Sequence, residues 1–172
     1  MFTFGTSNIV KQLKNLMIMR KVLLFFMFML ALPVLADEIP DYQIEGAGTG
    51  SQGTYLVRVS VLSKKSKILD NEVGRCAVHG VLFRGFANKE ARQQQKPLAG
   101  SPMVEQQNVK FFEDFFKEDG VFVNYFQIVS GSRQVVKAGK QYKVTATVTV
   151  AKDQLRKDLQ DAGIIKGLNT GF

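Results

Sequence analysis

Three glycines early in the chain, Gly48, Gly50 and Gly53, have the G-x-G-x-x-G spacing of a dinucleotide-binding motif. In that motif the glycines follow a strand and open a helix, so that backbone amides at the helix N-terminus meet a pyrophosphate. Here they precede TYLVRVSVL, whose alternating apolar residues are typical of a strand. We therefore expect no nucleotide site, and interpret the glycines as a flexible lead-in or a bulged strand edge.

Cys76 and His79 are the only residues of their kinds and lie three positions apart on an expected helix. Thiol catalysis would also need an orienting group and an oxyanion site, and zinc requires three or four ligands. We expect Cys76 to be a small buried thiol. Because Glu72 and Arg75 share its polar edge, His79 is expected to be a surface histidine paired with a carboxylate.

The carboxylate pairs Glu113–Asp114 and Glu118–Asp119 are adjacent in sequence. Neighbouring residues on a helix point in different directions, so neither pair converges on one substrate. The sequence also has no G-x-S-x-G and no H-E-x-x-H motif. We therefore predict a protein that is not an enzyme and has no catalytic residues, metal or cofactor.

The N-terminal 36 residues have the order of a secretory signal peptide. Arg20 and Lys21 are followed by the uncharged VLLFFMFMLALPVLA, which ends in small residues around Ala36. The stretch is shorter than the roughly 20 apolar residues of a bilayer-spanning helix, so cleavage near Ala36 is favoured over a retained anchor. The residues before Met17 are interpreted as an upstream start extension. The predicted location is the periplasm or the exterior.

The formal net charge of the whole sequence is +8. Removing residues 1–36 leaves 136 residues with 19 basic and 15 acidic side chains, a net charge of +4. This is a usual length and charge for one soluble domain, and we expect no nucleic-acid partner. A single cysteine excludes an intramolecular disulfide. The tightest basic cluster is Lys64, Lys65 and Lys67, which with Arg84 is the candidate anion contact; a solvated loop is the alternative.

The remaining pattern predicts an α+β fold in the order strand, helix, helix, strand, strand, helix. A mainly antiparallel sheet of three or four strands is expected to carry two or three helices on one face. Residues 37–53 are interpreted as a flexible Gly-rich lead-in, and 54–172 as a single domain with an apolar tail. The expected elements after the first strand are a helix capped by Asp70, a polar loop over 87–100, a helix from Ser101 to Gly120, strands over 121–130 and 141–150 with a hairpin turn at Ala138-Gly139, and a helix ending near Gly163.

Apolar residues in the second half exceed what one small core obviously needs. Four phenylalanines lie within residues 111–116, and core packing is the first interpretation of them. A partner surface is the other interpretation. The candidate contacts are Phe83, Phe86, Phe112, Phe116, Ile164, Ile165, Leu168 and Phe172.

The opening strand TYLVRVSV, the small-residue helix around GRCAVHGV and the closing YKVTATVTVAKDQLRKDLQ together resemble the small FlgT-like periplasmic α+β domains of bacterial flagellar-assembly and outer-membrane accessory proteins. The resemblance is one of topology over residues 54–160 and implies a structural or docking role, with no site residues. We therefore expect an exported interaction or assembly module of an envelope complex. Its partner would be an envelope protein or a second copy, with possible proximity to a membrane surface. The alternative is a periplasmic binding domain for an anionic lipid, glycan or polymer.

Overall fold

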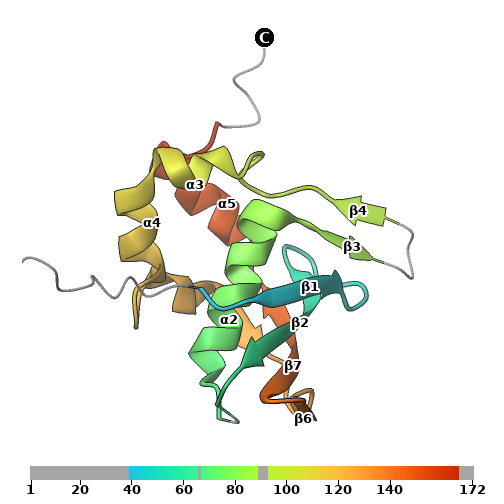
Figure 1. Cartoon of the computed structure of the whole chain (residues 1–172). Coiled ribbons are helices and arrows are strands. Elements are labelled where there is room, and N and C mark those ends of the chain that lie inside the picture. The colour runs from blue at the N-terminus through green and yellow to red at the C-terminus, as the bar shows by residue number, and fades with distance from the viewer. Residues whose placement is uncertain (1–38, 66, 89–92, 167–172) are drawn as a thin grey trace, which may run out of the picture. The chain divides into compact units, whose positions relative to one another are not determined.

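The computed structural model describes residues 39–65, 67–88 and 93–166. The chain divides into two units, 1–38 and 39–172, and all described residues belong to the second (Figure 1). This unit has the predicted α+β fold, with four helices and an antiparallel sheet of five strands instead of three or four. The predicted signal peptide lies outside the described residues. Within the described residues, no helix is long and apolar enough to cross a membrane.

The sheet has the strand order β1 (Tyr42–Gly46), β2 (Tyr55–Ser63), β7 (Gln141–Val150) and β5 (Phe126–Ile128). Strand β6 (Gln134–Ala138) pairs with β7 on the same side as β5. In the central β2–β7 pair the predicted alternation is confirmed. Val57, Val59 and Val61 are fully buried and lie opposite Val148, Ala146 and Val144, which are also fully buried.

Strand β1 corrects the interpretation of residues 37–53 as a flexible lead-in. Tyr42 and Ile44 alternate with Gln43 and Glu45, and the whole strand pairs with β2. The glycine motif lies in the loop that joins these strands, where Gly48 and Gly53 have positive φ angles of 121° and 79°. Glycine tolerates this conformation without steric cost. The loop leads into β2 and not into a helix, as expected for a chain without the dinucleotide fold.

Helix α2 (Asp70–His79) is the central helix, and every residue from Val73 to His79 is buried. Its N-cap is Leu69, and the predicted capping role of Asp70 is wrong: the Asp70 carboxylate accepts a hydrogen bond from Arg133. A π-helical turn (Gly80–Arg84) continues α2, with the Gly85 amide donating to the Gly80 carbonyl at 2.9 Å. Single π turns of this kind are uncommon.

The polar segment 87–100 is not simply an exposed loop. Strands β3 (Phe86–Asn88) and β4 (Gln93–Gln95) form a separate two-stranded sheet. After them the amides of Leu98 and Ala99 donate to the carbonyls of Val81 and Leu82, which ties the segment to the end of α2.

The helix predicted from Ser101 to Gly120 is two helices, α3 (Met103–Gln107) and α4 (Val109–Phe116). The break is at Asn108, whose backbone is non-helical (φ −126°, ψ 40°) and whose side chain donates to the Val104 carbonyl at 2.9 Å. Asparagine forms such local bonds readily and so interrupts helices.

The strand predicted over 121–130 is also corrected. Residues Val121–Tyr125 form a 3₁₀ helix, η2, and only Phe126–Ile128 form β5. Phe122 and Tyr125 are three residues apart, so one turn of 3₁₀ helix buries both. Between β5 and β6, the Ser132 hydroxyl accepts a hydrogen bond from the Thr147 amide at 3.0 Å. A side-chain oxygen thus replaces the backbone carbonyl that a paired strand residue would offer to β7.

The last helix is as predicted, whereas the hairpin turn lies one residue later than the predicted Ala138-Gly139. The β6–β7 turn is Gly139-Lys140, with Gly139 at φ 63°. Helix α5 (Lys152–Asp161) ends in a Schellman motif, in which Gly163 has φ 71° and the Ile164 amide donates to the Leu159 carbonyl at 2.9 Å.

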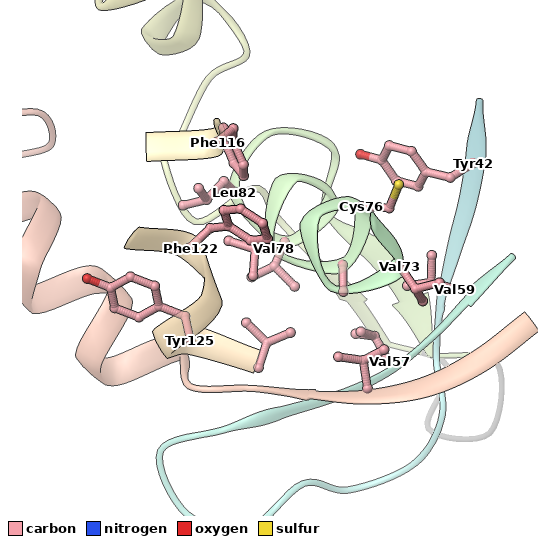
Figure 2. Close-up of a cluster of buried hydrophobic side chains, with 14 of the residues drawn as sticks. Tyr42, Val57, Val59, Val73, Cys76, Val78, Leu82, Phe116, Phe122 and Tyr125 are labelled. Atoms are coloured by element: carbon pink, nitrogen blue, oxygen red, sulfur yellow. The ribbon is translucent and has the colours of Figure 1, made fainter. Parts of the chain in front are cut away.

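The core gathers around α2. Figure 2 shows Val73, Val78 and Leu82 facing side chains from β2, α4 and η2, with Tyr42 of β1 beside Cys76. Helix α2 therefore packs against β2, β7, β5 and η2.

Candidate functional site

His79 and Cys76 are not placed as a catalytic pair. Burial raises the pKa of the Cys76 thiol to about 12, so it is protonated and a poor nucleophile at neutral pH. His79 is buried, contrary to the expected surface position, and its Nε2 is 3.0 Å from Glu105 Oε1 of α3. The expected carboxylate partner is thus present, but it comes from another helix.

Tyr42 completes a buried network with His79. Its hydroxyl is 2.6 Å from His79 Nδ1, and a neutral imidazole protonated at Nε2 satisfies both neighbours. Burial lowers the pKa of His79, against the opposing influence of the Glu105 carboxylate. Burial also raises the pKa of Tyr42. The three side chains connect β1, α2 and α3, and the burial of Tyr42 and His79 indicates a structural role.

The predicted phenylalanine contacts are corrected by their burial. Phe83, Phe86, Phe112 and Phe116 are 2–8% exposed, and Phe83 packs edge-on against Phe112 with ring centroids 4.9 Å apart. Rings that pack against one another inside the core are not available to a partner, so the core interpretation of this cluster holds. Ile164 and Ile165 are half-buried against the same core. Leu168 and Phe172 lie outside the described residues.

The three lysines of the predicted anion contact do line one pocket of about 400 Å³, here called the lysine pocket. Its lining consists of Pro40, Asp41, Leu62, Ser63, Lys64, Lys65, Lys67, Glu72 and Gln141. Arg84 belongs elsewhere: its guanidinium lies 4.0 Å above the Tyr42 ring and donates to the Tyr42 carbonyl at 3.0 Å. The carboxylates of Asp41 and Glu72 share the lysine pocket with the three lysines, and their negative charge reduces its attraction for anions.

Strand β6 is an exposed element that the sequence analysis did not single out. All five of its residues are exposed, including Val135 at 46% and Val136 at 59%. Among the described strands it pairs with β7 alone, so its other edge is open. Such an edge presents backbone donors and acceptors to any extended chain.

The direction of these backbone groups follows from the register. Ala138 and Gln141 close a two-residue turn, and paired residues alternate between hydrogen-bonded and non-bonded positions along an antiparallel ladder. The amides of Val135 and Lys137 therefore point to the open edge, whereas that of Val136 faces β7.

No family model, curated protein or solved structure matches this chain. The FlgT-like resemblance thus stays a prediction, and the functional argument rests on the geometry of the site. Two features support different kinds of binding: the open edge of β6 and the lysine pocket. Within the described residues, no group of three or more His, Cys, Asp or Glu side chains is arranged to hold a metal ion.

Proposed function

We propose that the chain is an exported, non-enzymatic interaction module of a bacterial cell envelope, and that it binds a protein partner by strand addition at β6. The observation that carries the proposal is the open edge of a strand that is exposed on both faces. Main-chain hydrogen bonds to such an edge provide affinity, and alternate side chains provide selectivity. The predicted signal peptide supports the envelope location.

The chemistry around β6 also favours a kind of partner. Lys137, Lys140 and Lys143 surround the hairpin turn and are all exposed, while Val135 and Val136 offer apolar contacts on opposite faces. An extended segment that alternates aliphatic and acidic side chains fits this edge best. Lysines at an edge also discourage pairing between two copies, because like charges repel.

Hydrogen exchange on the full chain tests the proposal. After capture of envelope proteins from the source bacterium, the amides of Val135 and Lys137 should become protected, whereas that of Val136 is protected before and after. The variant Lys137→Pro removes an outward amide and should abolish capture while leaving the fold intact. Val136→Pro is the contrasting variant. It removes an amide that faces β7, so it should break the hairpin itself. Capture that survives Lys137→Pro, with unchanged exchange at Val135, would refute strand addition.

The lysine pocket favours a second function, binding of an anionic lipid, glycan or polymer. Lys64, Lys65 and Lys67 bring three ammonium groups to one hollow of about 400 Å³. Binding to phosphatidylglycerol vesicles should weaken steeply as salt rises, and should be lost when the three lysines are replaced by glutamine. Equal binding to phosphatidylcholine vesicles would contradict a charge-based site.

A further inference from the structure

A second hollow lies between α4, the turn that follows it and the C-terminal half of α5, and it shares no residue with β6 or the lysine pocket. Its volume is about 380 Å³, and we call it the α4–α5 pocket. Volumes of this order are typical of small-molecule sites. In Figure 1 the two helices lie at the left and centre of the described unit.

One wall of the α4–α5 pocket is aromatic. Phe111 stacks on Phe115 with ring centroids 6.0 Å apart, and Phe115 stacks on Tyr125 at 5.7 Å, with interplanar angles of 21° and 22°. Phe111 is half-buried, while the two rings behind it are 5% exposed. The wall is therefore rigid, because the inner rings are packed into the core and hold the outer one.

The remainder of the lining carries three carboxylates, on Asp114, Asp119 and Asp158, against one ammonium group, on Lys117. The Lys117 ammonium is bound to Asp114 at 3.4 Å. The Tyr125 hydroxyl, which points out of the core cluster in Figure 2, donates to Asp158 at 2.8 Å. Hydrogen bonds from Gln154 and Tyr125 lower the pKa of Asp158, so this carboxylate is charged at neutral pH.

We propose that the α4–α5 pocket binds a small organic cation, an amine joined to an aromatic or aliphatic group. The amine would lie among the carboxylates, and the apolar group would lie against the aromatic wall, where rings also attract cations through their π faces. The carboxylates disfavour anions, and the apolar wall disfavours a hydrated inorganic ion. The inference goes beyond the proposed function and stands without it.

Titration of the full chain with phenethylamine, followed by NMR of backbone amides, tests the proposal. A ligand of this size should bind with a Kd on the order of 1 mM or below and shift the signals of residues 111–125 and 158–162. Phenethyl alcohol has nearly the same shape without the charge, and should bind about tenfold more weakly or worse. N-acetyl-lysine methylamide represents a protein side chain and should also bind more weakly.

Variants separate the pocket from general surface charge. Asp158→Asn keeps an acceptor for Tyr125 and should weaken phenethylamine binding about fivefold or more. Glu113→Gln is the control, an exposed α4 carboxylate outside the pocket, and should change binding less than about twofold. Equal affinity for the alcohol, equal effects of the two variants, or no binding at all would overturn the proposal. Tighter binding of the lysine derivative would also overturn it, by assigning the pocket to a protein partner.

Discussion

Replacing Tyr42 by phenylalanine removes one oxygen atom from the Tyr42–His79–Glu105 network, in which Tyr42 and His79 are buried. The ring is retained, so no cavity forms and Arg84 keeps its position above the ring. His79 Nδ1 loses the donor 2.6 Å away and becomes a buried acceptor without a partner. The other tautomer offers no escape, because Nε2 must still donate to Glu105.

The expected loss of stability is about 2 kcal/mol, since an unsatisfied buried polar group costs about 1–3 kcal/mol. With a urea m-value of about 2 kcal/mol/M, the unfolding midpoint should fall by about 1 M. Tyr55→Phe is the matched control: its hydroxyl is only half-buried and donates to Gln95 at 3.2 Å. It should lose less than half as much.

Urea titration followed by circular dichroism measures both variants at neutral pH. Because His79 is the only histidine, its imidazole nitrogens can be assigned directly by NMR, and Nε2 should carry the proton in the wild-type chain. If Tyr42→Phe and Tyr55→Phe shift the midpoint equally, or if Nδ1 carries the proton, then the inferred network is wrong.

Three further predictions concern the same folded unit. Because burial lowers the pKa of His79, the neutral imidazole contributes its full stabilisation above about pH 6.5, and this contribution is lost as the pH falls below that value. The urea concentration at the unfolding midpoint should therefore be lower at about pH 5.5 than at about pH 7.5, and the difference should be smaller in His79→Gln. Asp119 has a positive φ of 57°, so Asp119→Gly should stabilise the chain by about 1 kcal/mol, seen as a thermal midpoint about 3 °C higher, while it weakens amine binding to the α4–α5 pocket. Phe122 is 2% exposed, and Phe122→Ala should cost about 3–5 kcal/mol in urea unfolding; a loss below about 1 kcal/mol would contradict its place in the core.

The parts of the fold that could be predicted are those with a long, uninterrupted pattern. Strand β7 alternates over ten residues, and one face of it is buried from Val144 to Val150. The end of α5 combines a glycine and an apolar residue at the spacing of a Schellman motif. In both cases local sequence and tertiary packing favour the same conformation, so the pattern is sufficient.

The predictions were wrong where the apolar pattern is short, or where its spacing fits both a strand and a helical turn. Strand β1 shows its alternation in Tyr42 and Ile44 alone, and the glycines that follow hide it. Residues 121–125 have strand-forming side chains, but the three-residue spacing of Phe122 and Tyr125 suits a 3₁₀ turn equally well. Asn108 was the available signal for the break between α3 and α4.

The candidate sites were less predictable than the fold, because they are made by contacts distant in sequence. His79 is 37 residues from Tyr42 and 26 from Glu105, and its own helix suggested a different partner. The aromatic wall joins α4 to η2, and its carboxylates come from α4, the following turn and α5. The open edge of β6 depends on strand order, which local patterns do not encode.

The pairing of β2 with β7 has a consequence for how the protein is made. Ser60 and Thr145 meet across that pair although 85 positions separate them, and α2 cannot be enclosed until both strands are present. The chain must therefore be synthesised through β7, to Val150, before the central ladder closes. Until then the apolar faces of β2 and α2 have no partner strand to cover them, and such exposed surfaces are prone to aggregation.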